Sequence, residues 1–184
     1  MSNFQEIQQI SGAYLLKNFY MEDLRGNFLK VHRFSQLPAE IAALDFRETF
    51  ATSSRKNVIR GMHFQLPPYD ISKLITVISG QVLDVVFDMR RSSPTFGNCF
   101  SILLGEKSSL RSIFVPSGCA HGFLALEDRS LMLYQSTCEF VPDHDSGIRF
   151  DSIGFAWPAD PENIILSDKD RELPPWDPQN TPFV

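Results

Sequence analysis

An all-β fold, a closed jelly-roll sandwich or barrel, is the class that this 184-residue sequence predicts. Three observations predict it: short strand-like runs dominate the chain, turn residues recur between them at regular spacing, and only one segment has a convincing helical pattern. In the clearest run, residues 82–88, valine and aspartate alternate with leucine, valine and phenylalanine. This period of two is typical of a strand in a sheet with two distinct faces.

The elements follow in order along the chain. One short helix is expected at residues 38–44, where an early proline precedes alanine-rich sequence. Ser79 and Gly80 predict a turn that joins two strands as a hairpin. An N-terminal arm over about residues 1–20 and an irregular, proline-rich tail over about residues 157–184 complete a single domain of residues 1–184. Strands are expected at residues 28–34, 73–78, 81–89, 109–115, 122–126 and 130–140.

Composition and charge exclude several classes of protein. Hydrophobic residues make up 43% of the chain, which is enough to bury a core, and the net charge of −5 argues against a nucleic-acid surface. The first residues lack the pattern of a signal peptide, and no run approaches the roughly 18 apolar residues of a membrane span. The three cysteines have no paired spacing, which favours a reducing compartment. The sequence therefore predicts a cytoplasmic protein that binds neither nucleic acid nor membrane.

Residues 60–65, with the sequence RGMHFQ, carry the strongest chemical signal. His63 lies in a short apolar run, and a free imidazole titrates at about pH 6.5, the range that proton-transfer catalysis needs. The alternative is a core histidine with a purely structural role. In a regular strand Arg60 and His63 point to opposite faces, so Gly61 must mark a bulge or the start of the strand if both contact one ligand.

Two other kinds of chemistry find little support in the sequence. No two of the four histidines lie within a few residues of each other, so metal ligands would have to come from scattered positions. The run GCAH at residues 118–121 is not a nucleophile elbow, and Cys119 is expected to be a small buried residue. We therefore expect neither a metal site nor a hydrolytic nucleophile.

Six segments, in a specific order and spacing, carry a resemblance to a known family. They are DLRGNF at 23–28, VIRGMHFQLPP at 58–68, DVVFDMRRSSPTFG at 84–97, FVPSGCAHGF at 114–123, GIRFD at 147–151 and LSDKD at 166–170, together with Lys73. On these motifs the chain resembles the dTDP-4-dehydrorhamnose 3,5-epimerase family, whose fold is a cupin-like jelly roll. The resemblance runs nearly from end to end.

The resemblance implies a homodimeric isomerase without metal or organic cofactor. The implied substrate is a nucleoside-diphosphate 4-keto-6-deoxy sugar, a precursor of deoxysugars and of lipopolysaccharide or O-antigen. Its C4 ketone acidifies the hydrogens on C3 and C5, so a base can form an enolate and an acid on the other face can return a proton with inversion. By resemblance, His63 is the base, Asp170 orients it, and Lys73 lies beside the enolate oxygen. The implied ligand contacts are Arg60 at the diphosphate, Arg25 and His121.

The sequence departs from the family pattern at several ligand positions. Where the family has a tyrosine as proton donor, before an x-Pro pair, this chain has Phe140, which has no proton to give. Tyr134 matches a different position and is expected to be structural. Lys30, Glu48 and Phe50 replace a glutamate, a glutamine and an asparagine where the family binds the nucleoside end. We expect altered base recognition, with neutral drift as the alternative.

Three functions remain open on this basis. The first is an active epimerase that inverts C3, C5 or both, uses CDP or GDP in place of dTDP, and takes its returning proton from water or another group. The second is a non-catalytic sugar-nucleotide binder or partner subunit, against which the joint presence of His63, Lys73 and Asp170 speaks. A sugar 3,4-ketoisomerase would need a different histidine arrangement and ranks last.

Overall fold

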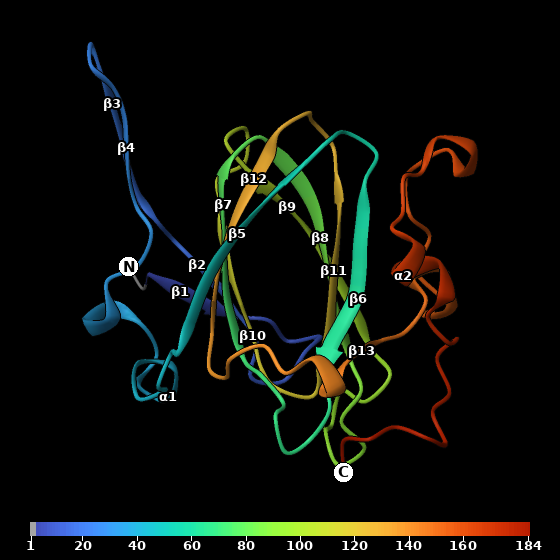
Figure 1. Ribbon diagram of the computed structural model, residues 1–184. Helices are drawn as coiled ribbons and strands as arrows, with labels where there is room; N and C mark the ends of the chain where they lie inside the picture. Colours follow the sequence, from blue (N-terminus) through green and yellow to red (C-terminus); the bar gives the residue numbers. More distant parts are fainter. Residues whose placement is uncertain (1–2) are drawn as a thin grey trace.

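Two antiparallel sheets face each other across the core of the computed structural model, which describes residues 3–184 (Figure 1). The six-stranded sheet has the order β1 (Phe4–Glu6), β2 (Tyr14–Leu16), β10 (Ser112–Val115), β7 (Lys73–Ser79), β12 (Ser130–Ser136) and β5 (Glu48–Ser54). The five-stranded sheet has the order β13 (Asp145–Gly147), β6 (Ile59–Gln65), β11 (Cys119–Ala125), β8 (Gln81–Asp88) and β9 (Cys99–Gly105). The predicted cupin-like jelly roll is confirmed.

The Ser79–Gly80 turn does not join a hairpin, contrary to the sequence prediction. Strand β7 pairs with β10 and β12, whereas β8 pairs with β11 and β9, so the turn crosses from one sheet to the other. Side chains on both faces of β8 are largely buried, with Val82, Asp84, Val85 and Val86 fully inaccessible. Burial on both faces is expected for a strand inside a sandwich. A two-stranded hairpin would leave one face exposed to solvent.

A separate two-stranded arm projects from the barrel. It consists of β3 (Phe19–Asp23) and β4 (Gly26–Lys30), and Figure 1 shows it standing clear of both sheets. The arm expected at residues 1–20 is therefore displaced, because β1 and β2 within that range join the six-stranded sheet. The strand expected at residues 28–34 ends at Lys30, and the strand expected to reach residue 140 ends at Ser136.

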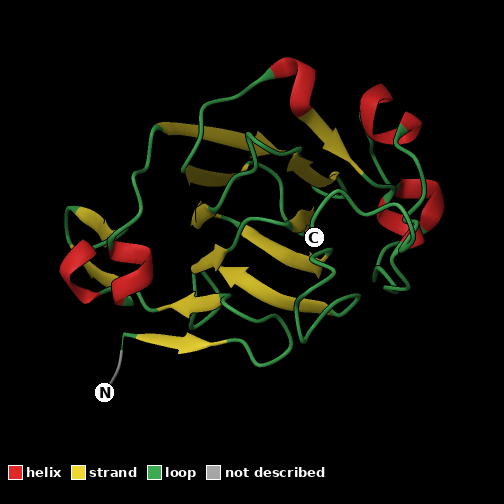
Figure 2. Ribbon diagram, turned by 90° about the horizontal axis from the view of Figure 1, so that it is seen from below, coloured by secondary structure: helices red, strands yellow, loops and turns green. Residues whose placement is uncertain are grey.

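The predicted helix is present, and the tail contains a second one. Helix α1 (Ala39–Ala42) is a single turn whose Ile41 is buried. Helix α2 (Asp168–Glu172) was not predicted; the Ser167 side chain caps it by accepting the N–H of Asp170 at 3.1 Å. Figure 2 shows the helical segments at the periphery, with the strands around the centre. No helix among residues 3–184 is long and apolar enough to cross a membrane.

A bulge in β6 resolves the parity problem at residues 60–63. Against β11, Arg60 pairs with Phe123 and His63 pairs with His121, so three steps on β6 match two on β11. Arg60 and His63 consequently share one face of the sheet. Gly61 has a φ of +114°, and a β-carbon there would lie 2.6 Å from the Cα of Gly122. Only glycine fits this close crossing of two backbones.

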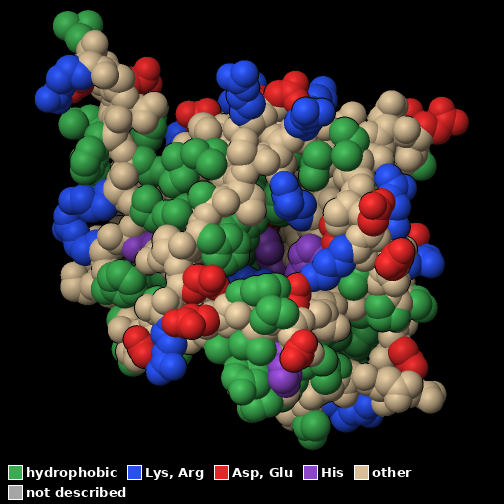
Figure 3. All heavy atoms as spheres, viewed as in Figure 1, with side chains coloured by type: hydrophobic (Ala, Val, Ile, Leu, Met, Phe, Trp, Pro, Cys, Tyr) green, Lys and Arg blue, Asp and Glu red, His purple; other side chains and the backbone are tan. Residues whose placement is uncertain are grey.

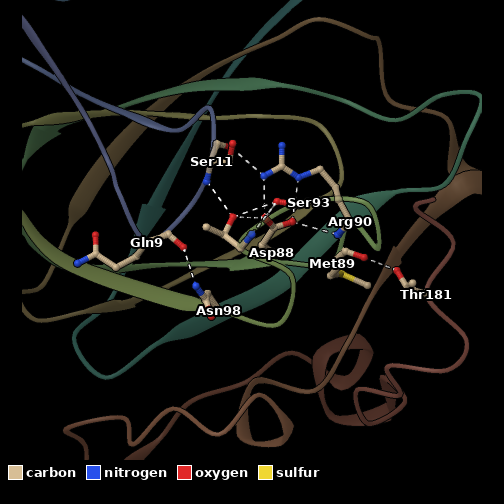
Figure 4. Close-up of polar contacts among 9 residues, drawn as sticks. Gln9, Ser11, Asp88, Met89, Arg90, Ser93, Asn98 and Thr181 are labelled. Atoms are coloured by element: carbon tan, nitrogen blue, oxygen red, sulfur yellow. Dashed lines mark hydrogen bonds and ion pairs between the residues drawn. The ribbon is translucent and has the colours of Figure 1, made fainter.

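Asp88, which is buried, and the neighbouring Met89 connect the N-terminal loop and the C-terminal tail to the barrel (Figure 4). The Asp88 carboxylate is the centre of the first of these two attachments. It accepts hydrogen bonds from the Arg90 guanidinium and from the hydroxyls of Ser93 and Thr95. Arg90 also donates to the carbonyl of Ser11 at 2.8 Å, which fastens the N-terminal loop. Nearby, the Thr181 hydroxyl donates to the Met89 carbonyl and fastens the tail. The tail that carries α2 is thus fastened to the barrel near its C-terminal end.

Candidate active site

A cavity of about 430 Å³ opens between the two sheets. Figure 3 shows a hollow on this face of the molecule, with histidine side chains inside it and Lys, Arg, Asp and Glu side chains around it. Strands β5, β6, β7, β12 and β13, helix α2 and the loops around residues 71 and 138–140 all contribute to the wall. The lining includes Glu48, Phe50, His63, Lys73, Ser136 and Phe140.

His63 and Asp170 form a hydrogen-bonded pair at this cavity. The Nε2 atom of His63 lies 2.5 Å from Oδ1 of Asp170, although the two residues are 107 positions apart. Helix α2 lies beside β6 and brings the carboxylate to the ring (Figure 1). Burial alone would raise the pKa of the Asp170 carboxyl, but the hydrogen bond from His63 holds this pKa below its ordinary value. The carboxylate is therefore charged at neutral pH.

Lys73 begins β7 on the opposite wall of the same cavity. Burial lowers the pKa of its ammonium from 10.5 to about 8, because the charged form loses hydration. Asp145 acts in the opposite direction, and the neighbouring Lys169 adds to the lowering. Lys169 and Asp145 themselves form an ion pair at the rim. The cavity thus contains a cation that titrates close to neutral pH.

His121 and Arg60 lie on the same inner face as His63 but are not part of the cavity wall. His121 is buried, and its Nε2 lies 2.8 Å from Oδ2 of Asp84, whose other oxygen has no hydrogen-bond partner among the described residues. Arg60 is exposed and donates from Nε to the hydroxyl of Ser54 at 3.0 Å. The structure therefore brings both residues to the neighbourhood of His63, without direct contact with the cavity.

Tyr134 is buried between the cavity and this second histidine. Its ring stacks on Phe50 at 4.8 Å between centroids and meets the His121 ring edge-on at 6.2 Å. Burial raises the pKa of the Tyr134 phenol well above its ordinary value, so the group keeps its proton at neutral pH. Sequence reasoning set Tyr134 aside as structural. The alternation along β12 shows that it faces inward together with Met132 and Ser136.

The four positions that depart from the family pattern separate into two groups. Glu48, Phe50 and Phe140 line the cavity together with His63 and Lys73, and Phe140 remains 55% exposed at the rim. Lys30 lies on the arm instead, with its ammonium about 6 Å from the rings of Phe19 and Phe28. Within one chain, these residues therefore do not form a single cluster.

Arg25 also lies on the arm, at the turn between β3 and β4. Its guanidinium is 84% exposed and pairs with Asp23 two residues away. The shallow depression next to it is lined by other arm residues alone, among them Met21 and Phe28. The arginine expected to contact the ligand is thus remote from the cavity of its own chain.

The sequence did not single out three polar residues that the structure brings to the cavity: Ser136, Asp145 and Lys169. Lys169 precedes Asp170 in the motif LSDKD, which is a signal that could have been used. Ser136 and Asp145 have no local sequence signature. Across residues 3–184, no group of three or more His, Cys, Asp or Glu side chains is arranged to hold a metal ion.

Known proteins resemble this chain in sequence along most of its length. The model of a family described as dTDP-4-dehydrorhamnose 3,5-epimerase matches residues 7–177. A dTDP-4-dehydrorhamnose 3,5-epimerase from Mycolicibacterium smegmatis is 36% identical over 167 residues, which cover 90% of this chain and 82% of the relative.

Solved structures are similar over nearly the whole chain as well. The dTDP-4-dehydrorhamnose 3,5-epimerase of Bacillus anthracis, with TDP and PPi bound, has a TM-score of 0.85 at 33% identity and covers 94% of this chain and 98% of its own. A dTDP-6-deoxy-D-glucose-3,5-epimerase from Legionella pneumophila, in complex with dTDP-4-keto-L-rhamnose, has a TM-score of 0.83 at 27% identity, with 95% and 98% covered. The similarities in sequence and in structure therefore point to the same family.

Proposed function

Because the chain belongs to the dTDP-4-dehydrorhamnose 3,5-epimerase family, and is thus a nucleotide-sugar epimerase of deoxysugar biosynthesis, we propose a residue-level course for its reaction. His63 removes a proton next to the C4 ketone of a nucleoside-diphosphate 4-keto-6-deoxy sugar, and Lys73 stabilises the enolate. A second group returns a proton on the opposite face. The observation that carries this proposal is the His63–Asp170 pair in a cavity whose other wall contains Lys73.

The hydrogen bond to Asp170 defines which nitrogen of His63 acts as the base. Nε2 faces the carboxylate, so in the neutral ring it carries the hydrogen and donates it to Oδ1. The lone pair of Nδ1 is then free to accept a proton from carbon. When the ring becomes an imidazolium, the charged Asp170 stabilises it, as a carboxylate does for a catalytic histidine elsewhere.

Tyr134 is the proton donor that we propose for the opposite face. Phe140 lines the cavity but has no proton to give, which leaves water or another side chain. The Tyr134 phenol is supported by its position, stacked on the cavity residue Phe50, and by its raised pKa. A neutral phenol that contacts an enolate can deliver a proton to it. The phenol can then regain a proton from solvent or from the protonated base.

The ammonium of Lys73 is expected to set the alkaline limit of the reaction. With a pKa of about 8, Lys73 loses its charge as the pH rises through that value, and enolate stabilisation falls with it. The turnover number measured from pH 6 to pH 10 should therefore decline above about pH 8.

A Lys73→Arg variant is the matched control, since guanidinium stays charged over this range. A decline that persists unchanged in this variant would contradict the assignment.

Between about pH 8 and 10.5 the unfolded chain binds more protons at Lys73 than the folded chain does. The contribution of Lys73 to the free energy of unfolding therefore rises with pH in this range. Titration of Lys73 thus lowers activity in a range where the same titration stabilises the fold.

The nucleotide is proposed to be CDP or GDP rather than dTDP. Glu48 contributes a carboxylate to the cavity, and this carboxylate forms neither an ion pair nor a hydrogen bond with any described residue. A carboxylate accepts hydrogen bonds, and cytosine and guanine have exocyclic amino groups that donate them, whereas thymine does not. Phe50 adds a flat apolar surface on the same strand.

We propose that the arm completes the cavity of a second copy of this chain in a homodimer. Leu24 is fully exposed at the arm's tip, and Phe19, Met21 and Phe28 are about half exposed along it, which is an unfavourable surface for an isolated chain. Arg25 could contact a ligand only in another copy. In a two-fold dimer, each arm can contact the neighbour's body in the same way.

Mixing two inactive variants tests the exchange of arms. Arg25→Ala and His63→Asn chains, denatured together and refolded, should regain about one quarter of wild-type activity, because half of the dimers are mixed and each has one intact site. If Arg25 acted within its own chain, no mixed dimer would contain an intact site. Absence of any regained activity, with the dimer mass verified by light scattering, would contradict the proposal.

Exchange of hydrogen with solvent tests the proposed function as a whole. The protein is incubated in heavy water with 4-keto-6-deoxyglucose linked to dTDP, CDP and GDP, and NMR follows deuterium at C3 and C5. We expect incorporation at one or both carbons, with one nucleotide preferred. A protein that binds these compounds without exchange at any carbon would be a binder rather than an enzyme.

A further inference from the structure

Ser136 has a hydroxyl that is buried without a partner at the wall of the cavity. The residue is 1% exposed, and its Oγ makes no hydrogen bond to any described residue. It ends β12 on the inward face and contributes to the lining together with His63 and Lys73. A buried hydroxyl without a partner opposes folding, so such a group calls for an explanation in function.

The register of the sheet places this hydroxyl beside the proposed enolate-binding cation. Ser136 pairs directly with Lys73 on β7 and with Glu48 on β5. Residues directly opposite each other in antiparallel strands have β-carbons about 5 Å apart. Glu48, Ser136 and Lys73 thus form one row across three strands, and all three contribute to the same cavity.

We propose that the Ser136 hydroxyl donates a hydrogen bond to the C4 oxygen of the substrate, and that it acts there together with the Lys73 ammonium. This inference rests on the proposed function, because the C4 oxygen becomes the enolate oxygen only if a proton leaves the neighbouring carbon. As that proton moves to His63, negative charge develops on the C4 oxygen, and two donors stabilise it better than one. The serine finds in the bound substrate the partner that it lacks in the free protein.

A serine at the other end of the same strand is a matched control. Ser130 is also buried on the inward face of β12, but its hydroxyl donates to the carbonyl oxygens of Gln81 and Glu127. Removal of that hydroxyl should lower the melting temperature and leave the reaction unchanged. Removal of the Ser136 hydroxyl should instead slow the reaction, while the melting temperature stays equal or rises.

The test compares deuterium exchange and thermal stability in Ser136→Ala, Ser136→Cys and Ser130→Ala. We expect both Ser136 variants to exchange about 100-fold more slowly than the wild type, at a melting temperature that is equal or higher. The dissociation constant of the corresponding nucleoside diphosphate should not change, since that ligand lacks the C4 oxygen.

The possible failures are distinguishable. If the wild type exchanges hydrogen and Ser136→Ala does so at the same rate, the role of Ser136 is wrong while the proposed function stands. If the loss in Ser136→Ala is matched by equally weaker binding of the nucleoside diphosphate, the hydroxyl does not act at C4. If the wild type exchanges no hydrogen with any 4-keto sugar nucleotide, the proposed function itself is wrong.

Discussion

His63→Asn is expected to lower the rate of deuterium exchange at the reacting carbons by about 1,000-fold, the loss typical of removing a general base. Asparagine retains a polar side chain that can still contact Asp170, but it has no basic nitrogen. Because the variant is close in size, binding of the nucleoside diphosphate should stay within a few-fold of the wild type. The measurement is the initial rate of exchange by NMR at saturating substrate.

Two further variants identify the cause of such a loss. His32→Asn removes a histidine outside the cavity and should leave exchange unchanged. Asp170→Asn retains the imidazole but removes the charge that stabilises its protonated form, so exchange should fall as well. Exchange at the wild-type rate in His63→Asn would assign the base to another residue.

Tyr134→Phe should separate proton removal from inversion. Without the phenol, His63 still forms the enolate, and it returns a proton or deuteron to the face from which it took one. We therefore expect deuterium incorporation to continue while formation of the inverted sugar falls by about 100-fold. The ratio of inverted to exchanged product, followed by NMR in heavy water, measures this separation directly.

Variants at two other rings are the controls for Tyr134. Tyr14→Phe removes a phenol that binds Glu40 on the outside of the protein and should change neither quantity. Phe140→Tyr restores a hydroxyl at the cavity rim, and its product should match that of the wild type if Tyr134 is the donor. Additional exchange or inversion at a second carbon in Phe140→Tyr would place the missing donor at position 140 instead.

The sequence predicted the fold class, because the alternation within a strand is local information; His63 as the base stays a prediction from the family resemblance. Alternation along residues 82–88 indicated a sheet, and the parity of Arg60 and His63 gave a bulge at Gly61 as one of two alternatives, the one that the structure has. Which strands pair with each other in a sheet, in contrast, is not local information. Nothing in Ser79 or Gly80 distinguishes a hairpin from a crossing between two layers, since only the packing of both strands decides it.

The position of Tyr134 shows why the rest of the candidate site could not be predicted. In a straight strand, Tyr134 and residue 140 would lie about 20 Å apart. The strand ends at Ser136, and Cys138 and Phe140 beyond it line the same cavity as Ser136, so the spacing of a straight strand does not apply there. The hydroxyl of Ser136 is likewise recognisable only from the absence of a partner, which is a property of the packed structure.

The attachment of the tail has a consequence for how variants of this protein should be interpreted. Phe183 packs edge-on against Phe64, next to His63 in the chain, while Arg91 contacts the backbone of residues 178, 179 and 183. These contacts secure the segment that follows Asp170. In a random mutagenesis screen for activity, we expect substitutions near the C-terminus to resemble loss of the proposed His63–Asp170 pair, although residues 177–184 contribute nothing to the cavity wall.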